Sequence, residues 1–363
     1  MSLSCGIVGL PNVGKSTLFN AITRASVAAS NYPFCTIEPN VGIVPVPDTR
    51  LGELARIFAS KQIVPATTTF TDIAGLVRGA SKGEGLGNAF LSHIREVDAI
   101  AMVVRCFDDA DVVHVDGDPD PLRDIETITL ELGLADLTVV EKRLDKSRQR
   151  AKAEPKTAPE ANALENLKTT LDAGKVARTF APDSLEMSLA KELALLTAKP
   201  TLYVANVDES GSEASLRRVA ACRQRAQAEG AQCVVLCAKL EAELAGLPAD
   251  EAAAFAKELG IERSGLDNLV VAAYRLLDLM TFLTAGEKET RAWTISRGTK
   301  APQAAGAIHS DIERGFIRAE IAAYEDLVRL KSLHAVREAG LLRSEGRDYV
   351  MQEGDVVNFR FNV

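Results

Sequence analysis

The stretch "GLPNVGKST", residues 9–17, decides how this chain folds. An apolar run, "LSCGIVG", leads into it and a helical pattern, "LFNAITRA", follows it. Strand, glycine loop and helix in this order, with the spacing G-x-x-x-x-G-K-[ST], are typical of a phosphate-binding loop. The backbone N–H groups of such a loop point at the phosphates, and the helix dipole adds to the attraction. The predicted phosphate ligands in this stretch are Asn12, Val13, Gly14, Lys15, Ser16 and Thr17.

Two further motifs are predicted to complete a site for a nucleoside triphosphate and Mg²⁺. In "TDIAG", Asp72 stands at a strand end, where it can bind Mg²⁺ through water, and the amide of Gly75 can reach the γ-phosphate. "PFCTIEPN" offers Thr36 as a second hydroxyl ligand beside Ser16, while Lys15 neutralises the β- and γ-phosphates. Together the motifs form two switch segments that sense the γ-phosphate and relax when it leaves.

Further strands and helices predict the fold class. Short β-branched runs recur at "TTTFTDIAG", "AIAMVVRCF", "TLYVANVD" and "QCVVLCAK", a pattern typical of parallel strands buried on both faces. We therefore expect an α/β phosphate-loop nucleotide-binding domain with a mostly parallel sheet. Between two of these strands, leucines at helical spacing (Leu130, Leu134, Leu137 and Leu144, then Leu164, Leu167 and Leu171, then Leu185, Leu189, Leu193 and Leu196) predict an inserted helical hairpin or short coiled coil.

The last strand pattern, "DVVNFRFNV", alternates apolar and polar residues and closes a small α+β module. The expected organisation is therefore a discontinuous nucleotide-binding domain at 1–124 and 199–278, a helical insertion at 125–198 and an α+β domain at 279–363.

Composition limits the classes of function. The chain has 363 residues, of which 47% are hydrophobic and 25% charged, as expected for a soluble protein of two or three domains. A net charge of −8 argues against wholesale electrostatic binding to nucleic acid, although a local basic face could contact RNA. No apolar run is long enough to span a membrane and no signal peptide is recognisable, so we expect a cytoplasmic protein. The six scattered cysteines predict reduced thiols.

The stretch "NVDESG", residues 206–211, raises the question of which base is bound. A guanine-binding loop would be Asn-Lys-x-Asp, but Val207 replaces the lysine and Glu209 replaces the aspartate. Loss of the forked acceptor removes most of the preference for guanine, since such buried hydrogen bonds discriminate by about 10⁴ to 10⁵-fold. One neutral amide can bind both the 6-amino group and N7 of adenine. We expect Asn206 to do so.

The motifs "GLPNVGKST", "NYPFCTIEPN", "TDIAGLVRGASKGEGLGNAFL", "NVDE", "CAKLE" and "IHSDIERGFIRAE" together resemble the YchF family of Obg-like nucleotide hydrolases over nearly the full length. The resemblance implies a helical insertion, a carboxy-terminal β-grasp module called TGS, ATP preferred over GTP, and association with ribosomes or other translation components. It also implies that "CAKLE" closes over the base. The implied base-binding residues are Asn206, Val207, Glu209, Cys237, Ala238 and Lys239.

Catalysis has to differ from that of small GTPases. Leu76 stands where those enzymes have a water-orienting glutamine. The resemblance points instead to His114, which could orient or deprotonate water beside the catalytic Lys15. It also suggests that Asn12 helps hold K⁺ beside the phosphates; a turn-forming asparagine is the alternative. Turnover on the order of 10⁻⁴ to 10⁻² s⁻¹ is expected for an unaided phosphate-loop switch.

The predicted function is a Mg²⁺-dependent ATPase that acts as a slow regulatory switch in translation or the stress response. The alternatives are a GTPase of ribosome assembly and a nucleotide-gated scaffold whose hydrolysis is incidental. Arg314 and Arg318, placed one helical turn apart in "IERGFIR", could touch RNA phosphates, or form a solvated helix face. Oxidation of Cys35 could disturb the neighbouring Thr36; an ordinary buried thiol is the alternative. The sequence does not indicate an oligomeric state.

Overall fold

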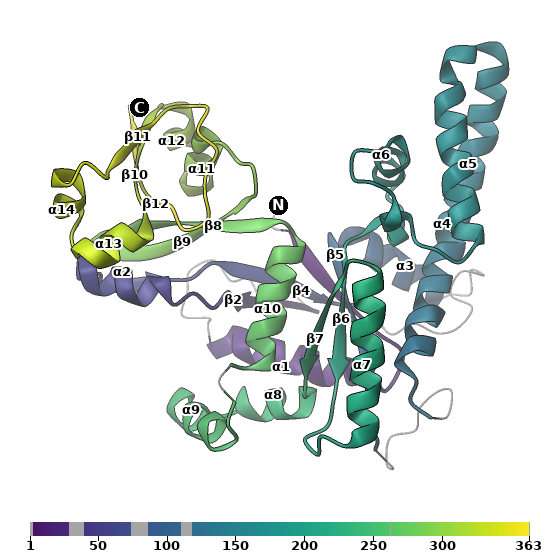
Figure 1. Ribbon diagram of the computed structural model, residues 1–363, viewed down its shortest axis with the longest axis horizontal. Coiled ribbons are helices and arrows are strands. Elements are labelled where there is room, and N and C mark those ends of the chain that lie inside the picture. The colour runs from purple at the N-terminus through teal and green to yellow at the C-terminus, as the bar shows by residue number, and fades with distance from the viewer. Residues whose placement is uncertain (1–2, 29–39, 74–85, 110–117, 262, 363) are drawn as a thin grey trace. The chain divides into compact units, whose positions relative to one another are not determined.

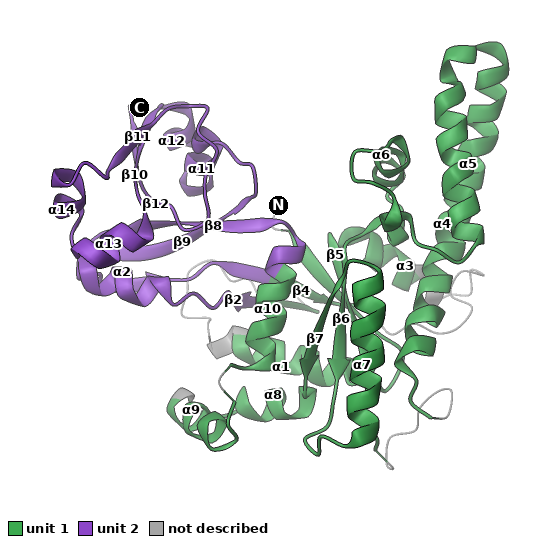
Figure 2. Cartoon of the chain, viewed as in Figure 1, with its two compact units in different colours: residues 1–27, 37–42, 69–273 green, residues 28–36, 43–68, 274–363 purple. Residues whose placement is uncertain are grey.

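The computed structural model describes residues 3–28, 40–73, 86–109, 118–261 and 263–362. The chain forms two compact units (Figure 2). Unit 1 contains residues 1–27, 37–42 and 69–273, and unit 2 contains residues 28–36, 43–68 and 274–363. The three-domain boundaries expected from the sequence stay a prediction. Residues 43–68, which they assign to the nucleotide-binding domain, belong to unit 2.

The sheet built around the phosphate-binding loop has the strand order β2-β4-β1-β5-β6-β7. Its strands are β1 (Ser4–Val8), β2 (Val41–Pro45), β4 (Thr67–Asp72), β5 (Ala99–Arg105), β6 (Thr201–Asn206) and β7 (Gln232–Leu236). β1 pairs in parallel with β4 and β5, and β5, β6 and β7 continue in parallel. Every residue of β5 and β6 is buried, as the continuous apolar runs predict. The expected α/β fold class is confirmed.

Helices follow the strands of this sheet. They are α1 (Lys15–Ala28), α3 (Leu86–Glu96), α7 (Glu213–Ala228), α8 (Ala238–Leu244), α9 (Ala249–Glu258) and α10 (Gly265–Leu276). Figure 1 shows α7 running alongside β6 and β7. Because β4, β1, β5, β6 and β7 are parallel, their carboxyl ends and the loops that follow them meet at one edge of the sheet. Among the described residues, no helix is long and apolar enough to cross a membrane.

The predicted helical hairpin is present, but part of its expected core is not. Helices α4 (Pro121–Ala153) and α5 (Ala158–Asp172) lie side by side and extend beyond the sheet (Figure 1). Leu144, Leu164, Leu167 and Leu171 are buried between them. Leu130 and Leu134, expected in the same stripe, are 56% and 39% exposed.

Short segments connect the hairpin back to β6. They are η2 (Pro155–Thr157), η3 (Ala177–Thr179), α6 (Leu185–Glu192) and η4 (Leu196–Ala198). Prolines lie at the ends of the helices, since α4 ends before Pro155 and α6 begins after Pro182. Leu185 was expected to be in the apolar stripe but is 45% exposed.

Unit 2 contains a second sheet with the order β11-β10-β12-β8-β9-β3. Its strands are β3 (Gln62–Val64), β8 (Leu279–Ala285), β9 (Glu289–Ser296), β10 (Phe316–Ala322), β11 (Arg343–Glu345) and β12 (Val356–Phe361). The helices of this unit are α2 (Arg50–Phe58), α11 (Ala301–Ile308), α12 (Ser310–Arg314), α13 (Tyr324–Leu330) and α14 (Leu333–Glu338). Phe282, Phe316 and Phe359 meet in its core, and the α+β class expected for the carboxy-terminal part is confirmed.

One expectation about this unit is wrong. Arg314 and Arg318 are not one helical turn apart, because α12 ends at Arg314, Gly315 follows it, and Arg318 lies in strand β10. Helix α12 is capped by His309, whose Nδ1 accepts the backbone N–H of Asp311 at 3.1 Å.

Candidate nucleotide-binding site

The phosphate-binding loop has the backbone that its glycines predict. β1 ends at Val8, α1 begins at Lys15, and Leu18 donates its N–H to the Gly14 carbonyl at 2.9 Å. Gly14 has a φ of 92°, and a Cβ added there would lie 2.1 Å from Nδ2 of Asn206. Both the backbone angle and the space therefore require glycine at this position.

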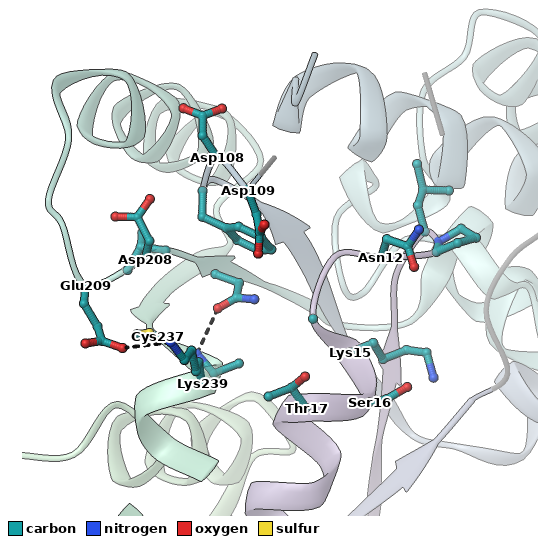
Figure 3. Close-up of a pocket in the computed structure, with 17 residues that line it drawn as sticks. Asn12, Lys15, Ser16, Thr17, Asp108, Asp109, Asp208, Glu209, Cys237 and Lys239 are labelled. Carbon is teal, nitrogen blue, oxygen red and sulfur yellow. Dashed lines mark hydrogen bonds and ion pairs between the residues drawn. The ribbon is translucent and has the colours of Figure 1, made fainter. Parts of the chain in front are cut away.

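The loop lines a pocket of about 900 Å³ at the carboxyl edge of the sheet. This volume is within the usual range for small-molecule sites. Three other segments line the same pocket: 107–109 after β5, 206–209 after β6, and 237–239 after β7. Figure 3 shows the labelled side chains of these segments arranged around a common space.

The structure brings most of the predicted site residues together. Those that line the pocket are Asn12, Gly14, Lys15, Ser16, Thr17, Asn206, Val207, Glu209, Cys237, Ala238 and Lys239. Val13 is fully buried and does not line it. Thr36, Gly75 and His114, together with Cys35 and Leu76, lie outside the described residues. The individual roles of all these residues stay predictions.

Lys15 and Asp72 form an ion pair at the phosphate end of the site. The Nζ of Lys15 contacts Oδ1 of Asp72, and the two side chains are 11% and 21% exposed. The charge predicted to face phosphate is therefore neutralised by the carboxylate predicted to face Mg²⁺. A bound Mg²⁺ and triphosphate would supply a separate partner for each charge.

The donors at this end fit Mg²⁺. Ser16, in the first turn of α1, offers a hydroxyl, and Asp72, the last residue of β4, offers a carboxylate. Mg²⁺ is usually held by one or two protein oxygens together with water and substrate phosphates. Within the described residues no group of three His, Cys, Asp or Glu side chains could hold a metal by itself.

The backbone conformation of Asn12 bears on its two predicted roles, binding K⁺ and forming a turn. Its φ is 64°, in the left-handed region that asparagine tolerates better than most residues. Asn12 therefore has a turn conformation, which was the alternative interpretation of this residue. Its binding of K⁺ stays a prediction.

Asn206, predicted as a base-binding residue, also makes contacts that the sequence did not predict. Its side chain is 4% exposed, donates from Nδ2 to the Val13 carbonyl at 2.9 Å, and accepts the Ala238 N–H at Oδ1 at 2.9 Å. The amide therefore ties the phosphate-binding loop to the loop expected to close over the base. A neutral amide has two N–H donors and two acceptor lone pairs, so these two contacts use half of its capacity.

Glu209 faces a lysine. Its Oε1 lies 3.9 Å from Nζ of Lys239, and the side chains are 53% and 75% exposed (Figure 3). Next to it, Asp208 accepts the Ser210 N–H at 2.8 Å, and hydrogen bonds from Ser210 lower the pKa of Asp208. Both carboxylates therefore have a partner within the protein.

Sequence reasoning also missed the pocket wall formed by Phe107, Asp108 and Asp109. A signal was available, because these residues follow strand β5 and ligands of open α/β sheets bind at the carboxyl ends of strands. Cys237 lies across the same pocket, where burial raises the pKa of its thiol.

The chain is similar to known proteins along its whole length. The family described as "50S ribosome-binding GTPase" matches residues 4–141, and the YchF GTPase carboxy-terminal family, described as "Protein of unknown function (DUF933)", matches residues 279–362. "Ribosome-binding ATPase YchF" of Bacillus subtilis (strain 168) is 55% identical, and the alignment covers 100% of both chains. The chain belongs to the YchF family.

Other members of the YchF family agree. The protein of the same description from Escherichia coli O157:H7 is 50% identical over 100% of both chains. A solved structure, "Structure of the Schizosaccharomyces pombe YchF GTPase", is 40% identical, covers 99% of this chain and 98% of its own, and has a TM-score of 0.88. The descriptions of these relatives name both ATPase and GTPase.

Proposed function

We propose that this chain is an ATP-binding, slowly ATP-hydrolysing regulatory switch that works on the ribosome. The observation that carries the proposal is the base loop, in which Glu209 faces Lys239 at the place where a guanine-binding loop has its free aspartate. The relatives described as ribosome-binding ATPases support the same assignment.

The geometry of the loop favours adenine for a physical reason. Guanine presents two N–H donors side by side and needs a free carboxylate at that point. Glu209 lies beside Lys239, and the carboxylate of Asp208 accepts from Ser210. Binding guanine would require one of these contacts to break, whereas adenine needs only the remaining N–H and lone pair of Asn206.

We assign the phosphate end to a Mg²⁺-bound triphosphate. Ser16, Asp72 and Thr36 would hold Mg²⁺, which would neutralise charge on the phosphates, and Gly75 would donate to the γ-phosphate. Lys15 would exchange its contact with Asp72 for the β- and γ-phosphates. His114 would then orient or deprotonate the attacking water; unchanged single-turnover hydrolysis by His114→Ala would remove it from that role. Equal hydrolysis rates in K⁺ and Na⁺ would leave Asn12 as a turn residue.

The ribosome is the proposed partner, which would imply a cytoplasmic protein. In unit 2, which we assign to the TGS class, Arg318 lies directly opposite Arg360 in the pairing of β10 with β12. Both guanidinium groups bind Glu320, at 3.1 and 3.0 Å. Two exposed arginines sharing one carboxylate keep a net positive charge, so this face could contact RNA phosphates. Arg314, the other predicted RNA contact, is itself paired with Asp311.

The base assignment is tested by calorimetric titration of the Mg²⁺-bound protein with ATP and GTP. We expect tighter binding of ATP, and a shift of preference toward GTP in the double variant Val207→Lys, Glu209→Asp. The matched control is Val207→Ala, Glu209→Gln, which removes the contact with Lys239 without restoring a guanine acceptor and should leave GTP binding weak.

A GTPase is the second candidate, because the Schizosaccharomyces pombe relative and one matching family are described as GTPases. Tighter binding of GTP than of ATP by the unaltered chain would establish this candidate in place of the proposed one.

A further inference from the structure

A buried arginine lies behind one wall of the nucleotide pocket. Arg105 is the last residue of β5, is 2% exposed, and does not itself line the pocket. Burying a charged side chain is costly unless it is paired and hydrogen-bonded. The described hydrogen bonds of Arg105 go to the segment that follows β5.

The guanidinium group holds the three-residue wall 107–109 at both ends. Its Nε donates to the Phe107 carbonyl at 3.1 Å, and its Nη2 donates to the Asp109 carbonyl at 3.2 Å. Its central carbon also lies 4.5 Å from the centre of the Phe107 ring. A planar fork of donors can make these contacts at once, whereas the point charge of a lysine cannot span them.

The surrounding charges keep this arrangement in place. Burial lowers the pKa of Arg105, and the nearby carboxylates of Asp109, Asp108 and Asp124 act in the opposite direction. Asp108 is itself held by Arg218, 2.9 Å away on α7. The wall is thus fixed from behind by Arg105 and from the side by α7.

The wall is also joined to the base loop. Asp208 accepts a backbone hydrogen bond from Asp108, and Cys106 donates its N–H to the Asn206 carbonyl at 2.8 Å. A shift of residues 107–109 would therefore alter the face of the pocket and also disturb its neighbour, residues 206–209.

We propose that Arg105 is a positioning residue of the nucleotide site, which sets nucleotide affinity by fixing the pocket wall formed by residues 107–109. The inference rests on the proposed function in one respect, that this pocket binds a nucleotide. Arg105 acts through backbone carbonyls and an aromatic ring and does not touch the ligand.

The test compares Arg105→Lys and Arg105→Met with the same two substitutions at Arg178. Arg178 is a matched control because it is a partly buried arginine of unit 1, 13% exposed and bound to Glu229 at 2.7 Å, that does not line the pocket. Calorimetry gives the dissociation constant of Mg²⁺-ATP, steady-state hydrolysis gives KM and kcat, and thermal unfolding without nucleotide gives stability.

We expect Arg105→Met to raise the dissociation constant and KM about tenfold, equivalent to about 1.4 kcal/mol. Because a wall contact affects the bound ground state and transition state equally, kcat at saturation should change by less than about threefold. Arg105→Lys, which can reach one carbonyl, should weaken binding by about threefold. Both Arg178 variants should lose thermal stability and keep nucleotide affinity within about twofold of the unaltered chain.

Affinities of the Arg105 variants that match those of the Arg178 variants would overturn the proposal and leave Arg105 with a structural role only. If Arg105→Met fails to fold, Arg105→Lys alone tests the proposal, and about threefold weaker binding of Mg²⁺-ATP by this variant would support it. Failure of the proposed function is distinguishable, because GTP would then bind the unaltered chain more tightly than ATP. The ratio of variant to unaltered affinity would still test Arg105 with GTP as the ligand.

Discussion

At the scale of single residues, Asn206 shows how one buried amide can determine the shape of a site. It joins the carbonyl of Val13 to the N–H of Ala238, and so connects two loops that line the same pocket. A residue that only bound adenine would matter when nucleotide is present. A residue that ties two loops together should matter in the empty protein as well.

We therefore expect Asn206→Ala to lower both stability and ATP affinity. Without the amide, one buried carbonyl and one buried N–H lose their partners, which costs about 1 to 3 kcal/mol each. The free energy of unfolding without nucleotide, measured by urea titration, should fall by at least about 1 kcal/mol. Leu216→Ala, an exposed change on the helix α7 that follows this loop, is the control and should have little effect. Unchanged stability of Asn206→Ala together with weaker ATP binding would mean that Asn206 only reads the base.

The sequence predicts the two halves of this site unequally, for a physical reason. Gly14, Lys15 and Ser16 could be assigned because a short contiguous motif fixes its own backbone. The tie made by Asn206 joins residues 193 positions apart, and Arg105 acts on carbonyls that no motif records. Contacts of this kind depend on how strands β5 and β6 are placed side by side.

At the scale of elements, periodicity predicted the helices better than the faces they bury. The spacing of leucines correctly predicted α4 and α5, and it correctly predicted burial of Leu144 and Leu167. It failed for Leu130 and Leu134, which are exposed although they share the helical spacing. The buried face of α4 in that region is formed by Ile125, Ile128 and Leu132. A stripe of leucines shows that residues share a side, but which side is covered depends on the neighbouring elements.

Three elements of unit 1 meet at the carboxylate of Glu229. Arg178 of η3 donates to it at 2.7 Å, Tyr203 of β6 at 2.6 Å, and Arg225 of α7 at 2.6 Å. Burial raises the pKa of Glu229, but these hydrogen bonds and charges outweigh burial and hold the pKa below its usual value. The folded state is therefore stabilised when Glu229 is ionised.

This node predicts a pH dependence of stability. A carboxyl whose folded pKa is depressed contributes stability that is fully present above its unfolded pKa, about 4.3, and is lost as pH falls through the lower folded pKa. We expect Glu229→Gln to lower the free energy of unfolding at pH 7 by about 2 to 4 kcal/mol, because the partly buried ion pairs lose their negative charge. In urea titrations the difference from the unaltered chain should be constant from pH 7 to about pH 5 and shrink below about pH 4. A difference that is independent of pH would contradict this account of the node.

At the scale of the whole molecule, the two compact units are discontinuous in sequence, and unit 2 includes a segment from the amino-terminal part of the chain. The segment between β2 and β4 leaves the first sheet, and residues 43–68 are part of unit 2. There β3 pairs in parallel with β9, and Arg50 binds Glu353 at 2.6 Å. Leu51 and Leu54 of α2 are 3% and 0% exposed. Composition along the chain could not reveal this exchange, because a local pattern indicates that a helix has an apolar face without indicating which distant segment covers it.

The exchange leads to a prediction about truncation. A chain that ends at residue 278, the boundary expected from the sequence, keeps residues 43–68 but removes β9 and Glu353. The apolar face of α2 and the edge of β3 would then be uncovered, and exposed patches and edges of this kind promote association. Size-exclusion chromatography and dye binding should show this shortened chain to be aggregated.

The backbone offers a matched control. Val46 donates its N–H to the Ala66 carbonyl at 2.7 Å, so the two ends of the segment already meet, and a four-residue glycine-serine linker can replace residues 47–65. All pocket residues lie in unit 1, so the shortened chain with this linker should be monodisperse and should still bind ATP. If the chain that ends at 278 is as soluble without the linker as with it, residues 43–68 do not depend on the carboxy-terminal residues for burial. The functional boundary would then follow the order of the sequence.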